Sequence, residues 1–343
     1  NYDDKQSLPV RRFVIENAFF WIEEFHIDVL RLDAVHSIID ESPKHILAEM
    51  NDTVQTRARR LGRQVHLIAE SDLNDSRLIR PKKQKGYGLS GQWSDDFHHA
   101  VHAYLTGERR GYYRDFGTIR DIAKAVTEGF VYDGQFSPFR GRKHGNSVRD
   151  LPPEKLVICT QNHDQVGNRA FGERLGTLVS FEAQKIAAML LLLSPQIPLL
   201  FMGQEYGEKS PFQYFTDHSD PGLIEAVAKG RKKEFSTFGF KAIPAPHALK
   251  TFSDSRLYWP LLKQKPHRQL WQWYQDLIFF RKKYWNKTRV ESVWFHERGQ
   301  WLAFEIRAGE KKWGLFYCFN LRGGGIPLGP FGLKGMLHSE HRR

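Results

Sequence analysis

The chain has 343 residues, of which 41% are hydrophobic and 26% charged, and its formal net charge is +12, so one large and one small packed domain are expected. The positive charge lies in short runs without the interleaved aromatic residues of a nucleic-acid-binding module, so we expect no nucleic-acid partner. No apolar run is long enough to cross a membrane, no secretion leader opens the chain, and Cys159 and Cys318 form no disulfide framework, which favours a cytoplasmic protein without a membrane partner.

The first seventy residues predict two helices and two strands. Pro9–Phe25 is an expected amphipathic helix, and Val29–Ala34 is an expected strand that ends near Asp33. Ser42 and Pro43 are typical of a helix start, with serine as the N-cap and proline at the first helical position, and this helix should run to Leu61. The face that we expect the first helix to bury has apolar residues at three- and four-residue steps: Val10, Phe13, Val14, Ala18, Trp21, Ile22 and Phe25.

The alternation of strand and helix continues, which predicts an α/β fold with a parallel sheet or barrel and helices outside it. The expected strands are Val65–Glu70, Gly91–Trp93, Leu156–Gln161 and Ile197–Met202, and the expected helices are Asp95–Leu105, Thr118–Val131, Phe181–Leu193 and Arg268–Tyr284. Near the end, Val290–Phe295, Trp301–Ile306 and Trp313–Asn320 indicate antiparallel strands. We therefore expect one domain over residues 1–287 and a small C-terminal β domain over residues 288–343.

Three acidic residues lie at or just beyond the ends of separate predicted strands: Asp33, Glu70 and Asp164. In a parallel barrel all strand C-termini open onto one face, so these acids would converge there. A pair of carboxylates about 5–5.5 Å apart can cleave a glycosidic bond with retention, one attacking and one donating a proton. A lone acid at a strand end is more often a cap or a loop anchor, but three of them together favour a site.

The neighbours of these acids fit the same chemistry. Arg31 lies two residues before Asp33, so both side chains should point to the same side of the strand, and the cation would keep Asp33 ionised. Glu70 follows an apolar run, whose partial desolvation would favour a protonated acid. His36 and His163 are donors suited to sugar hydroxyls.

At these residues the sequence resembles the α-amylase superfamily, glycoside hydrolase family 13. The matching segments are Val29–His36 (VLRLDAVH), Ile68–Asp72 (IAESD) and Gln161–Gly167 (QNHDQVG). The resemblance implies that Asp33 is the nucleophile, Glu70 the proton donor and Asp164 the transition-state stabiliser. It also implies sugar contacts for Arg31, His36 and His163.

A narrower resemblance is to the trehalose-releasing hydrolases of this superfamily. It implies cleavage of the α-1,4 bond next to the terminal trehalose of maltooligosyltrehalose or a related α-1,4-glucan, with no cofactor and no metal. The segments are Trp93–His99, His163–Arg169, Phe201–Glu208, Pro211–Pro221 and Gly230–Phe235. The further substrate contacts that it implies are Asp95, Asp96, Phe97, His98, His99, Gln165 and Asn168.

The predicted strands correspond to strands four to eight of the family's (β/α)8 barrel, so the resemblance predicts a partial barrel. The start at Asn1 instead of Met also suggests a fragment. Because five strands cannot close such a barrel, we expect the chain alone to be unstable and inactive. Two alternatives stay open: a glucan branching enzyme that uses the same acids, and a non-catalytic glucan-binding fragment. The spacing of His98 and His102 could suggest zinc, but the glutamate of the HExxH pattern is absent.

Overall fold

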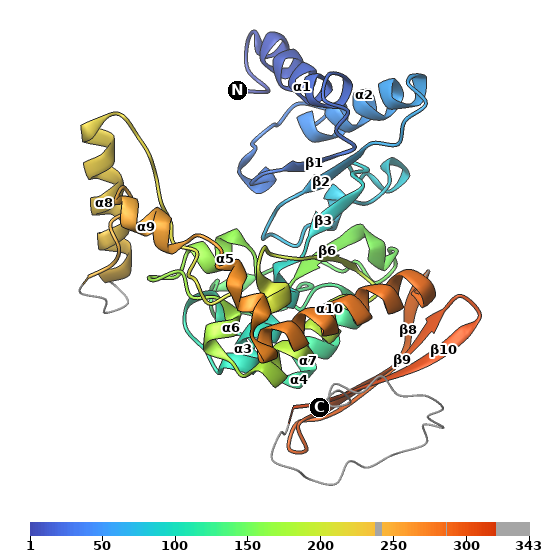
Figure 1. Cartoon of the computed structure of the whole chain (residues 1–343). Coiled ribbons are helices and arrows are strands. Elements are labelled where there is room, and N and C mark those ends of the chain that lie inside the picture. The colour runs from blue at the N-terminus through green and yellow to red at the C-terminus, as the bar shows by residue number, and fades with distance from the viewer. Residues whose placement is uncertain (237–241, 286, 320–343) are drawn as a thin grey trace. The chain divides into compact units, whose positions relative to one another are not determined.

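A computed structural model of the chain describes residues 1–236, 242–285 and 287–319. They form two compact units (Figure 1). Unit 1 comprises residues 1–100, 109–158 and 195–197, and unit 2 comprises residues 101–108, 159–194 and the described residues from 198 onward. The boundary that the sequence predicts near residue 287 lies inside unit 2, and the predicted two-domain division stays a prediction.

Ten α-helices and ten strands lie in the described residues. The helices are α1 (Ser7–Glu23), α2 (Ile46–Arg60), α3 (Asp95–Thr106), α4 (Ile119–Glu128), α5 (His163–Gly167), α6 (Leu175–Leu178), α7 (Phe181–Leu192), α8 (Pro221–Ser236), α9 (Leu249–Asp254) and α10 (Lys265–Tyr284). The strands are β1 (Val29–Leu32), β2 (His66–Ala69), β3 (Gly91–Trp93), β4 (Phe136–Ser137), β5 (Arg142–Lys143), β6 (Leu156–Cys159), β7 (Ile197–Leu199), β8 (Thr288–His296), β9 (Trp301–Ala308) and β10 (Lys311–Cys318).

Unit 1 is built on a parallel sheet whose strands follow the order β1-β2-β3-β6. In the register of β1 and β2, Leu32 lies opposite Ala69, so the residues that follow both strands lie at the same edge of the sheet. Helices α1 and α2 pack beside each other next to these strands (Figure 1). Their contacts form the core around Phe19, Val54 and Leu67, where each large apolar side chain contributes about 1.5–3 kcal/mol by its burial. The predicted α/β class is confirmed.

Helix α1 buries only part of the face that its apolar spacing predicts: Ala18 and Ile22 are buried as expected, but most of the other predicted residues are exposed. The structure buries Ile15, Ala18, Phe19 and Ile22, whereas Phe13 is 74% exposed. Two other residues of the predicted face, Trp21 and Phe25, are also exposed. The helix is apolar on most of its circumference, so spacing alone cannot identify the side that faces the sheet.

The start of α2 differs from the prediction as well. The helix begins at Ile46 with His45 as its N-cap, and not at Ser42 and Pro43. Ser42 instead donates a hydrogen bond to the buried carboxylate of Asp40, which also forms a 2.8 Å ion pair with Arg11. Burial alone would raise the pKa of Asp40, but the hydrogen bonds from Ser42 and Arg11 lower it to about 2. The serine thus supports a buried ion pair before the helix begins.

Unit 2 packs α10 against α7. Arg281 of α10 donates 2.7 Å hydrogen bonds to the carbonyl oxygens of Leu192 and Ser194, which lie just beyond or at the end of α7. A second contact joins Tyr274 of α10 to Gln204 at 3.0 Å. The two bonds from Arg281 satisfy carbonyl groups that the end of a helix leaves without partners, whereas the contact between Tyr274 and Gln204 joins two side chains.

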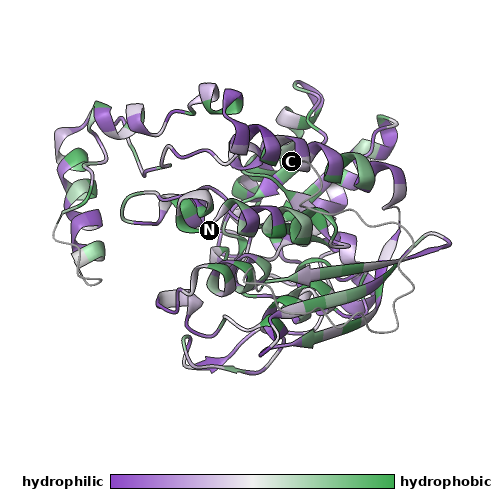
Figure 2. Ribbon diagram, turned by 60° about the horizontal axis from the view of Figure 1, so that its bottom comes forward, coloured by the Kyte–Doolittle hydropathy of each residue, from purple (hydrophilic) through white to green (hydrophobic). Residues whose placement is uncertain are grey.

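The C-terminal strands of unit 2 form an antiparallel sheet of order β10-β9-β8, as predicted. Figure 2 shows apolar and polar residues alternating in bands along its strands, the pattern of a sheet with one packed face. Residues 320–343 of the predicted C-terminal domain lie outside the described residues. In the part of the chain that the structure describes, no helix has the length and apolar content needed to cross a bilayer.

Candidate active site

Two of the predicted catalytic acids lie side by side at one edge of the unit 1 sheet. Asp33 directly follows β1 and Glu70 directly follows β2. The Glu70 amide donates to the carbonyl oxygen of Leu32 at 2.8 Å, and the Glu70 carbonyl accepts from the Val35 amide at 3.1 Å. These backbone bonds extend the parallel pairing to the two acids, so the sheet itself fixes their backbones relative to each other.

Arg31 connects the two carboxylates. Its Nη1 lies 2.8 Å from Asp33 Oδ1, and its Nη2 lies 3.7 Å from Glu70 Oε2. The guanidinium lies over the ring of Trp93, 4.3 Å from the ring centroid, an arrangement favourable for a cation on an aromatic face. The prediction that Arg31 and Asp33 point to the same side of β1 is confirmed by their ion pair.

The two carboxylates differ in their access to solvent. The Asp33 side chain is 76% exposed, and that of Glu70 is 14% exposed. Glu70 Oε2 also accepts a 2.7 Å hydrogen bond from the amide of Ala34. Ala34 adopts a left-handed conformation with φ of 44°, which is strained for a residue with a side chain. The turn after β1 therefore holds Glu70 in one position and leaves Asp33 open to a ligand.

A second polar cluster lies just after Glu70. Asp72 accepts hydrogen bonds from Nη1 and Nη2 of Arg140 at 3.1 and 3.2 Å. The Nδ1 atom of His36 lies 4.0 Å from Asp72 Oδ1, and His144 contacts the Asp72 carbonyl at 2.8 Å. The sequence analysis did not single out Arg140 or His144, which come from an irregular segment around β4 and β5 without a recognisable motif.

The predicted substrate contacts at the start of α3 lie mostly inside unit 1. Asp96 is buried, and its Oδ2 accepts hydrogen bonds from the amides of Val131 and Tyr132 and from Asn74. Burial raises the pKa of the Asp96 carboxyl to about 6. Asp95 is partly exposed. Asp96 thus holds the segment after α4 in place.

The three residues after Asp96 are also buried. Phe97 is part of the core, and His98 Nε2 lies 2.9 Å from the hydroxyl of Tyr113. His99 packs against the rings of Tyr112 and Phe116. These positions do not support direct substrate contact for Asp96, Phe97, His98 and His99, because all four side chains are buried.

The third predicted acid, Asp164, lies in unit 2 on the short helix α5. The N-cap of this helix is Asn162, whose side chain accepts from the amides of Asp164 at 2.9 Å and Gln165 at 3.2 Å. His163 Nε2 lies 3.5 Å from Asp164 Oδ1, and both side chains are about half exposed. Gln165 is buried and Asn168 is exposed. The cap holds His163 and Asp164 side by side on a solvent-accessible turn.

A charged cluster that the sequence analysis missed supports α5. Glu108 forms a bidentate pair with Arg169, both contacts being 2.9 Å, and lies 2.9 Å from Nε2 of His102. Hydrogen bonds from His102 and Arg169 lower the pKa of Glu108 to about 2. His102 is thus a hydrogen-bond partner of Glu108, and burial lowers the pKa of its imidazole. Among the described residues no group of three or more histidine, cysteine or acidic side chains is arranged to hold a metal ion.

Comparison with known proteins yields no matching family model. The chain is 52% identical over 284 residues to the malto-oligosyltrehalose trehalohydrolase of Saccharolobus solfataricus, an alignment covering 83% of this chain and 48% of the relative. It is 42% identical over 312 residues to the enzyme of the same name from Rhizobium sp., which covers 89% of this chain and 52% of that relative. The chain thus spans about half the length of the curated relatives that it matches.

A solved structure of a Salmonella typhimurium protein assigned as an alpha amylase gives a TM-score of 0.79 at 37% identity, covering 90% of this chain and 54% of that one. Together these relatives confirm the resemblance to the α-amylase superfamily and, within it, to the trehalohydrolases. The homologues are glycoside hydrolases, and the similarity extends well beyond the three short segments on which the prediction rested.

Proposed function

We propose that the protein containing this chain is a retaining glycoside hydrolase that cleaves the α-1,4 bond next to the terminal trehalose of maltooligosyltrehalose and releases trehalose. One observation supports the chemistry most strongly: Arg31 lies between Asp33 and Glu70, 2.8 and 3.7 Å away, at the ends of adjacent parallel strands. The relatives at 42–52% identity, whose name is malto-oligosyltrehalose trehalohydrolase, support the substrate.

In the first step Asp33 attacks the anomeric carbon, while the bond from that carbon to the leaving glycosidic oxygen breaks. Glu70 transfers its proton to that oxygen, and the sugar stays covalently bound to Asp33. The exposed carboxylate of Asp33 suits attack, because the reacting carbon must reach it. The 2.8 Å contact with Arg31 orients the attacking carboxylate.

In the second step Glu70, now ionised, takes a proton from water, whose oxygen bonds to the anomeric carbon as the bond to Asp33 breaks. The small exposed fraction of Glu70 and its hydrogen bond from the Ala34 amide keep the carboxyl oriented through both steps. We propose that Asp164 stabilises the positive charge on the sugar, with sugar contacts from Arg31, His36 and His163.

We revise the remaining substrate contacts in the light of burial. Asp95 and Asn168 remain proposed contacts, because both are accessible. Gln165 is buried and its backbone amide is held by the α5 cap, so we propose it as a positioning residue. Four buried residues of α3 become proposed positioning residues: Asp96, Phe97, His98 and His99. We propose no cofactor. The predicted cytoplasmic location and the absence of a nucleic-acid partner stay predictions.

We also propose that the parallel strands correspond to strands four to eight of a (β/α)8 barrel. The apolar residues exposed on α1, and Val29 exposed on β1, support this, because in a complete barrel both would be covered by further strands and helices. On this proposal the chain alone should show no saturable hydrolysis, and saturable turnover of maltooligosyltrehalose by the purified chain would contradict it.

The test of the activity uses the full-length protein that contains this chain, incubated with maltooligosyltrehalose. Chromatography should detect free trehalose, and Asp33→Asn should abolish its release. The matched control is Asp28→Asn, which removes another exposed acid whose ion-pair partner among the described residues is Arg63. New α-1,6 branches without trehalose would show a branching enzyme instead, and glucan binding without turnover would show a non-catalytic protein.

A further inference from the structure

Unit 1 contains a cavity of about 650 Å³ that the proposed reaction does not use. Such a volume falls within the range of small-molecule sites, roughly 300–1,000 Å³. Three segments of unit 1 line it: residues of α2, the crossover between β2 and β3, and the turn before β6. The lining includes Asp52, Thr56, Arg59, Lys82, Leu151 and Lys155.

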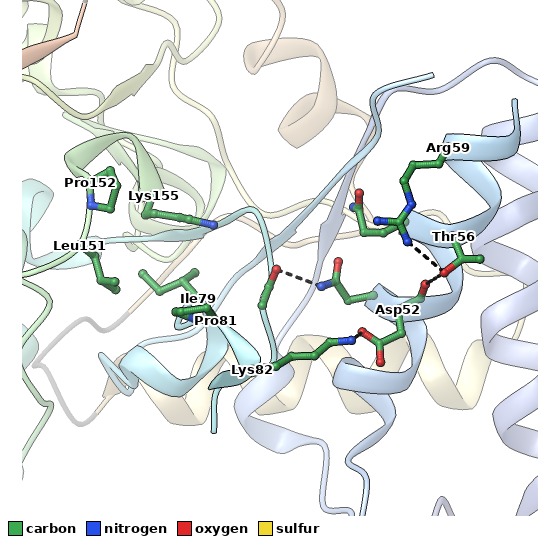
Figure 3. A pocket seen from close by; sticks show the side chains of 12 residues that line it. Asp52, Thr56, Arg59, Ile79, Pro81, Lys82, Leu151, Pro152 and Lys155 are labelled. Atoms are coloured by element: carbon green, nitrogen blue, oxygen red, sulfur yellow. Dashed lines mark hydrogen bonds and ion pairs between the residues drawn. The ribbon is translucent and has the colours of Figure 1, made fainter. Parts of the chain in front are cut away.

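The cavity has a polar wall and a mainly apolar wall (Figure 3). Helix α2 presents Asp52, Thr56 and Arg59 on one side. Leu151 and Pro152 lie on the opposite side, with Lys155 beside them. A ligand with both polar and apolar faces therefore fits between the walls better than a wholly apolar one.

The two sides are tied together by hydrogen bonds. Asn51 of α2 donates to the carbonyl oxygens of Tyr87 at 3.2 Å and Gly88 at 2.9 Å, in the crossover that precedes β3. Lys155 donates to the carbonyl oxygen of Leu89 at 2.9 Å. These bonds keep the cavity formed in the absence of a ligand, so binding need not order its walls.

The cavity has more positive than negative charge. Its lining includes the cations Arg59, Lys82 and Lys155 and one acid, Asp52. Asp52 is already paired, with Lys82 and, at 2.8 Å, with Lys44. The three cations and one acid of the lining leave a net charge of +2.

Two of these cations have no acidic partner. In the described part of the chain no carboxylate lies within ion-pair distance of Arg59, whose Nη2 has only a 3.4 Å contact with the Thr56 hydroxyl. The same holds for the described surroundings of Lys155, whose Nζ contacts the Leu89 carbonyl. Burial lowers the pKa of Lys155, which shows the electrostatic cost of this cation without a counter-charge.

The cavity also lies away from the candidate active site within unit 1. Gly88 precedes β3 and Lys155 immediately precedes β6, so the cavity adjoins the N-terminal ends of these parallel strands. Asp33 and Glu70 follow the C-terminal ends of β1 and β2. Strands of a parallel sheet point the same way, so these are opposite edges, and the cavity is not an extension of the glucan site.

We propose that this cavity binds a phosphate monoester of monosaccharide size. The phosphate would lie between Arg59 and Lys155, and the hydroxylated body would lie against Gln55, Thr56 and the apolar side chains opposite. A phosphate monoester has a charge of about −1.5 to −2 near neutral pH, which matches the net charge of the lining. A neutral glucan would leave both cations without a counter-charge, and none of the described lining residues is an aromatic on which a sugar ring could stack.

The test is calorimetric titration of the full-length protein with glucose 6-phosphate at constant ionic strength, with glucose and inorganic phosphate as comparison probes. We expect glucose 6-phosphate to bind more tightly than either probe. Arg59→Met and Lys155→Met should each weaken it roughly ten-fold or more, the effect of losing a charge-assisted hydrogen bond. The matched control is Arg60→Met, which removes an exposed cation of α2 that does not line the cavity.

Arg59 is exposed, so its substitution tests the site without disturbing the fold even if Lys155→Met unfolds. The proposal would be overturned by three results: no binding of glucose 6-phosphate at millimolar concentration, equal binding of glucose, or equal weakening by Arg60→Met and Arg59→Met. Because binding does not require Asp33 or Glu70, loss of this site and loss of the proposed hydrolase activity are separate outcomes.

Discussion

Unit 1 has two polar regions that differ in how their charged side chains are paired. At the C-terminal ends of β1 and β2, Arg31 is shared by Asp33 and Glu70. In the cavity beside α2, Arg59 and Lys155 have no carboxylate within ion-pair distance among the described residues. The first region has its cation and anions paired before any ligand arrives, and the second has an excess of positive charge.

This difference indicates two kinds of ligand. A site for a neutral glucan needs balanced charges that act during the reaction, because the substrate itself brings none. A site with uncompensated cations gains most from an anion, which supplies the missing counter-charge. The following predictions test whether the two regions differ in this way, from the largest expected effect to the smallest.

The largest effect should come from the proton donor. Glu70→Gln keeps the shape and the hydrogen bond from Ala34 but removes the transferable proton, so turnover of maltooligosyltrehalose should fall by about 10²–10⁴-fold. Steady-state kinetics of the full-length protein measures it. Glu41→Gln, at an exposed acid outside the site, is the control. A Glu70→Gln variant that keeps more than a tenth of the turnover would exclude this residue as the general acid.

The next effect concerns the buried Asp96 carboxylate, which among the described residues accepts hydrogen bonds from the side chain of Asn74 and from two backbone amides. The folded-state pKa of Asp96 is about 6 against an ordinary 3.8. The folded protein therefore binds more protons than the unfolded chain between those values, so its free energy of unfolding falls as pH rises from about 4 to 6 and is level above. The contribution is on the order of 2–3 kcal/mol.

Asp96→Asn cannot titrate, so the difference in unfolding free energy between wild type and variant should change over this pH window and nowhere else. Denaturant titrations at pH 4, 5, 6 and 7 measure the difference. Parallel curves for the two proteins would show that Asp96 does not have a raised pKa and that its burial is compensated in another way.

A smaller effect should follow from removing the shared cation. Arg31→Met removes both charge contacts, so kcat/KM should fall roughly ten- to hundred-fold, as for loss of a charge-assisted hydrogen bond. Arg31→Lys should restore only part of it, because an ammonium lacks the planar fork that reaches two carboxylates. Unchanged kinetics in Arg31→Met would show that the charge contacts of Arg31 do not contribute to catalysis, which would contradict the comparison of the two regions.

The smallest expected effect is on the free energy of unfolding and comes from a substitution outside both regions. Thr118 caps α4 through a capping box with Asp121. Thr118→Ala should lower the free energy of unfolding by about 1 kcal/mol without changing catalysis or binding. The control is Thr127→Ala, because the Thr127 hydroxyl donates to the carbonyl oxygen of Ala123 inside the same helix. Thermal unfolding should show a smaller loss of unfolding free energy for Thr127→Ala than for Thr118→Ala. Equal losses of unfolding free energy in the two variants would show that the helix cap does not account for the effect of Thr118→Ala.

The sequence predicted the parts of the fold that depend on local pattern. Alternating strands and helices placed Asp33 and Glu70 at strand ends, and two-residue spacing placed Arg31 beside Asp33. It predicted the buried side of α1 only in part, with Ala18 and Ile22 correct and Phe13, Trp21 and Phe25 wrong, because that helix is apolar on most sides. It also missed the start of α2, where Ser42 bonds to Asp40 instead of capping a helix.

Features assembled from distant segments could not be predicted at all. The pairing of Arg140 with Asp72 joins residues 68 positions apart, and the cavity combines α2 with residues 79–88 and 151–155. No spacing rule connects such residues. The sequence likewise did not predict the burial of Asp96 and His98, because a polar residue on a helix is ordinarily expected at the surface.

The central claim is that Asp33 is the nucleophile of a retaining reaction, and the most direct measurement is to trap its covalent intermediate. The full-length protein is incubated with a fluorinated glycosyl fluoride that forms the glycosyl-enzyme quickly and hydrolyses slowly, then digested and analysed by peptide mass spectrometry. The account predicts one sugar adduct, on Asp33, which is absent in Asp33→Asn and present in Asp28→Asn. An adduct on another carboxylate, or turnover of the reagent with inversion at the anomeric carbon, would contradict it.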